Sequence, residues 1–219
     1  MSQGLTFLFT YTYSKALFDS FAGNGANRLS DPFNAKAEKG LAESDIRHRV
    51  TSNALYELPF FRGQSGLAAQ LLGGWQANGV LVAQTGMPIY PIQATEPIPD
   101  GCPRCNPRPD RLANGNLSSD QRTLQRWFDT SAFKIAVGHY GTSGRNILSA
   151  PGLTNLDFSL FKNFRVSETK RFQFRWEMYN ATNTPAFNAP GLTIGTGTFG
   201  QVTSAGLGRV MQFGLRFEF

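Results

Sequence analysis

Cys102 and Cys105 are the only cysteines in the 219-residue chain, and their two-residue separation is used by both zinc sites and redox motifs. A zinc site would need two further ligands, and the only histidines, His48 and His139, lie far away in sequence. A redox motif is expected where a helix begins beside a βαβ unit, whereas Pro103 indicates a turn. We therefore predict a local disulfide formed in an oxidising compartment, which adds roughly 2 kcal/mol locally in the loop-entropy model.

A second group of chemically capable residues, Asp45, Arg47, His48 and Arg49, lies where a polar segment meets a predicted strand. Catalysis would need a nucleophile or a metal beside His48, and the sequence offers neither. We interpret the group as a solvated strand end. The sequence thus predicts no catalytic residue, no metal ligand and no cofactor, and an enzyme is the least favoured class of function.

The composition favours short strands and turns over helices, since the chain has 19 Phe and 23 Gly residues but is only 41% hydrophobic. The net charge of +6 comes from 21 scattered Lys and Arg residues, so we predict a solvated or lumenal polar face and no nucleic-acid partner. No apolar run approaches the roughly 20 residues that a spanning helix needs. Crossing a membrane with strands remains possible.

The last thirteen residues, 207–219, alternate between apolar and polar side chains, which predicts a strand with one apolar face. Its polar positions include Gln212, Arg216 and Glu218. Ending on an aromatic residue suits a strand that closes a membrane barrel, because the last ring can lie at the lipid interface. The residues expected to form this barrel-assembly strand are Phe213, Leu215, Phe217 and Phe219.

The same alternation recurs along the chain and predicts six strands, with the third the weakest in pattern. Their expected ranges are about 4–17, 47–60, 71–86, 154–165, 171–180 and 207–219. The connections alternate between long and short, as in outer-membrane barrels with long extracellular loops and short periplasmic turns. Within the long loop before the fourth strand, residues 118–128 could form a short helix, and the loop aromatics are expected to pack the loop on itself.

Several charged side chains are expected to face one side of adjacent strands. They could form a lumen wall that contacts a plug or a ligand, or they could be cross-strand ion pairs that hold the register. We favour the second interpretation. The residues are Asp157, Arg175, Glu177, Arg216 and Glu218.

Seven segments that touch nearly the whole chain resemble the C-terminal end of a TonB-dependent outer-membrane receptor of the Oar-like kind. They are YTYSKAL at 11–17, SDIRHRVTSNALYELPF at 44–60, GGWQANGVLVAQTGMPI at 73–89, WFDTSAF at 127–133, GRNILSAPGLTNLDFSLFKNF at 144–164, FRWEMYNATNTPAF at 174–187 and GRVMQFGLRFEF at 208–219. The resemblance implies a barrel of about 22 strands around an N-terminal plug in the bacterial outer membrane.

Residues 1–219 lack that plug and most of that barrel, so we expect a fragment of a longer receptor that does not transport alone. The start of the chain also lacks the pattern of a secretory signal. The partners implied by the resemblance are outer-membrane lipid, the missing N-terminal strands and plug, the barrel-assembly machinery, and the TonB system through the plug. The transported ligand is not implied.

A rival hypothesis is a soluble secreted β-sandwich that acts as a binding module. Its inner core would bury the same aromatic rings that a membrane sheet exposes to lipid. The placement of Phe158, Trp176, Phe213 and Phe217 therefore separates the two hypotheses.

Overall fold

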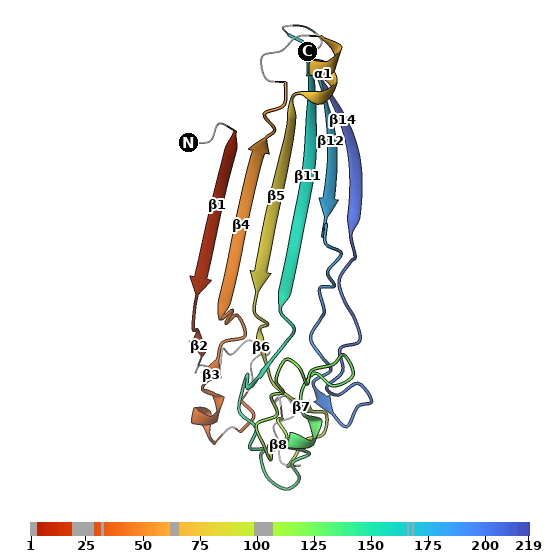
Figure 1. Ribbon diagram of the computed structural model, residues 1–219. Helices are drawn as coiled ribbons and strands as arrows, with labels where there is room; N and C mark the ends of the chain where they lie inside the picture. The colour runs from red at the N-terminus through yellow and green to blue at the C-terminus, as the bar shows by residue number, and fades with distance from the viewer. Residues whose placement is uncertain are drawn as a thin grey trace.

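The protein is described from a computed structural model at residues 4–18, 29–31, 33–61, 66–98, 107–165, 167 and 169–219. Figure 1 shows a long antiparallel sheet whose short turns lie at one end and whose long connections gather at the other. Cys102 and Cys105 lie outside the described residues, so their predicted disulfide stays a prediction.

One six-stranded antiparallel sheet dominates the described part of the chain, and neighbours in space follow the chain order. This confirms the predicted all-β fold class with six strands. The strands are β1 (Leu5–Tyr13), β4 (His48–Glu57), β5 (Trp75–Gln84), β11 (Leu153–Arg165), β12 (Arg171–Tyr179) and β14 (Val210–Glu218).

The register explains why the alternation in sequence produces two distinct faces. Residues paired across adjacent strands share a face, and a single row of partners crosses all six strands. One such row is apolar and consists of Leu5, Tyr56, Ala77, Leu160, Trp176 and Phe213. The next row faces the other way and is mostly polar: Thr6, Leu55, Asn78, Ser159, Glu177 and Gln212.

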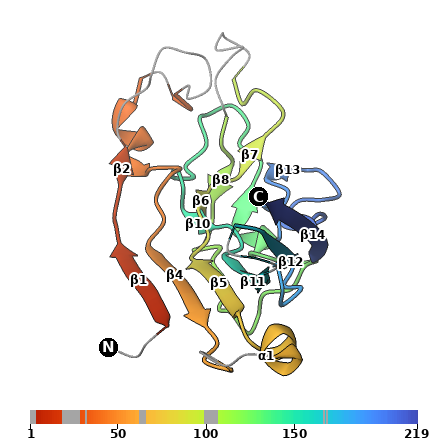
Figure 2. The ribbon, with the colours of Figure 1, turned by 90° about the horizontal axis from the view of Figure 1, so that it is seen from above.

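The turn between β4 and β5 contains a short helix, α1 (Leu67–Leu72), which the sequence did not predict. Consequently β5 begins at Trp75 rather than near residue 71. The helix ends where Gly73 N–H donates to the carbonyl of Ala69 and Gly74 adopts a φ of 69°. Seen from above, the strands follow one another in an open arc, with α1 on one side and the long connections on the other (Figure 2).

The described residues of the long connections, within 14–47, 85–152 and 180–209, gather at one end of the sheet, and we call them the loop lobe. Its two-residue strands are β2 (Leu17–Phe18), β3 (Gly40–Leu41), β6 (Pro88–Ile89), β7 (Ile92–Gln93), β8 (Asp110–Arg111), β9 (Phe133–Lys134), β10 (Leu148–Ser149) and β13 (Thr193–Ile194). Its described residues also include two 3₁₀ helices, η1 (Ala35–Glu38) and η2 (Thr130–Ala132). The parallel pair β7–β13 joins the second connection to the third.

A small hydrophobic core lies inside the loop lobe, formed by Phe128, Ala132, Phe133 and Leu148. The rings of Phe128 and Phe133 meet edge to face with centroids 6.0 Å apart. These two aromatics thus pack the connection on itself, as expected.

The helix expected at 118–128 is wrong, because this segment consists of turns and bends. Its backbone groups form only short turns among themselves and also bond to a different connection. Trp127 N–H donates to the Gly200 carbonyl at 2.8 Å, and Leu124 accepts from Val202 N–H at 2.7 Å. Tertiary pairing therefore overrode the local helix signal.

The β-sandwich hypothesis is not favoured by this architecture. Within the described residues, no second sheet covers the apolar face of the six-stranded sheet. Phe213 is 70% exposed and Leu215 is 80% exposed, whereas a sandwich would bury them. None of the helices in the described part of the chain is long and apolar enough to span a membrane.

Candidate functional site

The first candidate surface is the apolar face of the sheet. The expected barrel-assembly residues Phe213, Leu215, Phe217 and Phe219 all project from it or follow it, and all are exposed. Aromatic rings pair across strands here. Trp176 stacks on Phe213 with ring centroids 6.1 Å apart, and the ring centroids of Phe172 and Phe217 are 4.6 Å apart. Their placement is as expected, whereas their role in assembly stays a prediction.

Amphipathic aromatic residues lie at both ends of this apolar face. At the end nearest the loop lobe, Tyr11 and His48 share a hydrogen bond of 2.9 Å, and the ring of Tyr13 lies 5.3 Å from His48. At the turn end, Trp75 donates its indole N–H to the Leu71 carbonyl at 3.3 Å. Rings with one polar edge at both ends of an apolar band are typical of membrane interfaces.

The five charges expected on one side of adjacent strands all occupy register positions on the polar face. Asp157 accepts from Asn155 and from the Asn180 N–H, both at 2.9 Å. Arg175 donates to Gln173 at 2.6 Å and lies over the ring of Phe161.

The remaining predicted charges make contacts of the same kind. Glu177 accepts from Gln212, Glu218 accepts from Arg171, and Arg216 lies 3.2 Å from Glu218. The pairs Glu177–Gln212 and Arg171–Glu218 join adjacent strands, as expected of pairs that hold register, whereas Arg216 and Glu218 lie on the same strand. Contact of this face with a plug or a ligand stays a prediction.

Lys162 interrupts the apolar face, and sequence reasoning overlooked it although the alternation places it there. It is buried and donates to the carbonyl of Gly73, just after α1. The ammonium lies 5.7 Å from the ring centroid of Trp75 and 4.9 Å from that of Phe164. An ammonium held between aromatic rings and a backbone carbonyl has replaced water with specific partners.

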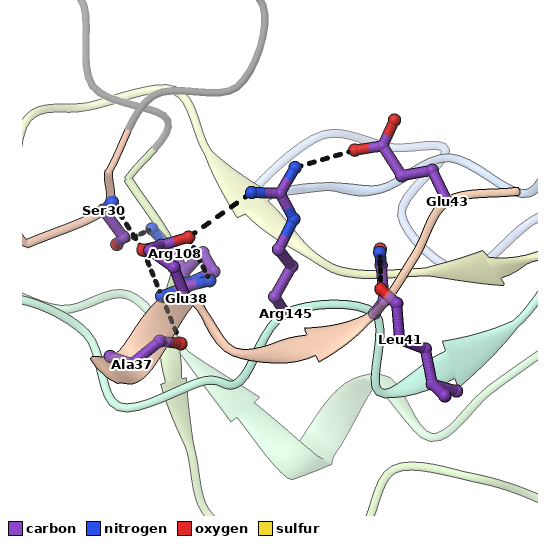
Figure 3. Close-up of polar contacts among 8 residues, drawn as sticks. Ser30, Ala37, Glu38, Leu41, Glu43, Arg108 and Arg145 are labelled. Carbon is purple, nitrogen blue, oxygen red and sulfur yellow. Dashed lines mark hydrogen bonds and ion pairs between the residues drawn. The ribbon is translucent and has the colours of Figure 1, made fainter. Parts of the chain in front are cut away.

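A buried charge cluster inside the loop lobe is the second candidate site (Figure 3). Glu38 and Arg108 are each only 2% exposed, and their side chains pair through two hydrogen bonds of 2.8 and 3.2 Å. The same carboxylate accepts from Ser30 N–H at 2.9 Å and lies 3.6 Å from Arg145. Arg145 also reaches Glu43, at 3.0 Å.

Burial lowers the pKa of Arg108, and the carboxylate of Glu38 opposes that change. Because an arginine guanidinium is effectively always protonated in proteins, Arg108 keeps its charge opposite the carboxylate of Glu38. The cluster therefore joins the first connection, which carries Glu38, to the second, which carries Arg108 and Arg145. Sequence reasoning missed it because these residues are too far apart for any local spacing to reveal.

The interpretation of residues 45–49 as a solvated strand end is wrong for Asp45, whose side chain is buried. Its carboxylate accepts from Ala16 N–H at 2.7 Å and from Arg47 at 3.1 Å. The backbone donor of the first connection therefore holds this carboxylate in place. His48 and Arg49 are exposed, as expected.

These features define a class of protein: a segment of the wall of a transmembrane β-barrel. Its strands have 9 to 13 residues, and about 9–11 are needed to cross a bilayer. One face is apolar with aromatic ends, and the opposite face is polar.

The family model of an outer membrane beta barrel domain matches residues 1–212, and the chain belongs to this family. The protein is therefore located in the bacterial outer membrane. Comparisons with curated proteins and with solved structures found no significant match.

Proposed function

We propose that residues 1–219 form the C-terminal part of the barrel of a TonB-dependent receptor of the Oar-like kind. In this proposal the complete receptor transports a ligand across the outer membrane, and the chain is not competent alone. It is neither an enzyme nor a cofactor-binding protein. Family membership supports the barrel, and the resemblance of seven segments supports the receptor.

The observation that carries this proposal is the pair of open sheet edges. Within the described residues, β1 and β14 are each paired on one side only. A nine-residue edge strand presents the backbone groups of about four residues to its unpaired side. Because each unpaired group costs several kcal/mol in hydrocarbon, the edges require further strands. We propose that the missing N-terminal barrel strands supply them.

The asymmetry of the connections supports an orientation. Outer-membrane barrels have short periplasmic turns and long extracellular loops. We therefore propose that α1 lies at the periplasmic side and that the loop lobe lies outside the cell, where it meets the ligand first. The barrel-assembly machinery, the plug and TonB remain proposed partners.

The receptor assignment is tested with the full-length gene product in detergent and the purified periplasmic domain of TonB. We expect saturable binding measured by biolayer interferometry, and we expect binding to vanish when the segment before the plug is deleted. Equal binding by the deleted form, or none by the full-length product, would overturn the TonB assignment while leaving the barrel intact.

Membrane placement is tested by the three tryptophans, which sample three environments. In variants of the full-length gene product that keep one of these tryptophans, with phenylalanine at every other tryptophan position, brominated lipids should quench Trp176 strongly. Trp127, in the loop lobe, should be protected, and Trp75 should respond best to bromines near the headgroup. Equal quenching of Trp127 and Trp176 would contradict the proposed placement.

A further inference from the structure

An apolar groove of about 430 Å³ opens at the turn end of the sheet. One wall comes from α1, and the others come from the sheet and from the chain that follows β4. Its lining residues are Leu58, Phe60, Phe61, Leu72, Trp75 and Leu160. A volume of this size lies within the range of small-ligand sites.

The groove is continuous with the lipid-facing surface. Leu160 and Trp75 belong to the apolar face, since Leu160 pairs with Ala77 and Trp75 pairs with Lys162. The helix that closes the groove, with sequence LAAQLL, carries no charge, and Leu67, Leu71 and Leu72 are exposed. A surface of this kind in a bilayer contacts hydrocarbon and not water.

Two contacts fix the position of α1 against the sheet. The indole of Trp75 donates to the Leu71 carbonyl, and Lys162 donates to the Gly73 carbonyl. Both donors come from the sheet and both acceptors lie at the end of the helix. The groove is therefore preformed, and it lies at the depth where an indole and an ammonium mark the boundary of the hydrocarbon.

We propose that this groove binds one acyl chain of a phospholipid from the membrane leaflet at the turn end. A lipid chain fits the apolar lining and the continuity of the groove with the bilayer face. A second protein copy fits less well, because a protein–protein interface normally has a polar rim and the residues that line this groove are apolar. The proposal rests on the proposed orientation only in naming that leaflet periplasmic.

The test uses native mass spectrometry of the full-length gene product released from phosphatidylethanolamine and phosphatidylglycerol nanodiscs. L72E places a carboxylate in the groove, and L67E places the same charge on the same helix away from the lining residues. We expect wild type and L67E to retain a phospholipid, and the lipid-bound fraction of L72E to fall at least about tenfold, since a carboxylate opposes burial of a hydrocarbon chain.

Both leucines are exposed, so both variants should fold. Folding is checked by the heat-modifiable band that a folded barrel gives on gels. Equal retention by L72E and L67E, no lipid on wild type, or a dimer without lipid would each overturn the proposal. The TonB-binding experiment is independent of this result, so failure of one leaves the other interpretable.

Discussion

The buried carboxylate of Glu38 should hold the first and second connections of the loop lobe together. E38Q keeps the shape of the side chain but removes its charge, leaving Arg108 and Arg145 in the protein interior without their shared partner. Four contacts converge on this carboxylate, at 2.8, 2.9, 3.2 and 3.6 Å. Breaking a buried pair by removing one partner costs about 3–5 kcal/mol.

The lower end of this range applies to E38Q, because the amide oxygen of glutamine can still accept a hydrogen bond. About 3 kcal/mol corresponds to roughly a hundredfold change in the local opening equilibrium, since about 1.4 kcal/mol is a factor of ten. E43Q is the matched control: it also removes one negative charge next to Arg145, but the Glu43 side chain is 55% exposed. Exposed pairs contribute below about 1 kcal/mol, so its effect should stay below roughly fivefold.

Hydrogen–deuterium exchange of the full-length protein in nanodiscs measures both effects. We expect the Ser30 and Arg108 amides to exchange roughly a hundredfold faster in E38Q, with the amides of β5 unchanged. Exchange in E38Q that is as slow as in wild type, or no faster than in E43Q, would contradict this role of Glu38.

Two further outcomes are expected elsewhere in the same fold. The hydrogen bond from Ser131 holds the pKa of Asp129 below its ordinary value, so the stability that this carboxylate contributes is complete above about pH 3.9 and is lost as pH falls through the lowered pKa. D129N should remove that part of the pH dependence of hydrogen–deuterium exchange near η2, and an unchanged pH profile would contradict this. In G86A the new methyl carbon would lie 1.7 Å from the Ala150 carbonyl oxygen, so we expect much less heat-modifiable protein than from G197A, whose added carbon meets nothing within 4 Å; equal yields would show that the backbone can yield at residue 86.

The six strands could be predicted from sequence because a sheet with lipid on one side imposes a strict two-residue period. That period is strong in β14, where Met211, Phe213 and Leu215 alternate with polar or small residues, and the observed bounds lie close to the expected ones. Lys162 shows the limit of this reasoning. Its position on the apolar face follows from the period, but the Gly73 carbonyl and the Trp75 ring that make the position tolerable come from another segment.

The loop lobe could not be predicted in the same way, since its order depends on contacts between distant segments. Glu38 and Arg108 are separated by 70 residues, and neither has a neighbour whose spacing indicates a partner. Residues 118–128 contain helix-compatible side chains, yet the backbones of Leu124 and Trp127 bond to residues 202 and 200. Local propensity is a weak guide where short segments bury few residues and tertiary pairing decides.

The parallel pair β7–β13 and the pairing of Glu38 with Arg108 link the three long connections to each other at one end of the sheet. Connections linked in this way cannot move separately without breaking bonds between them. Any widening of the barrel at this end would therefore move the described parts of the three connections together, unless these bonds break.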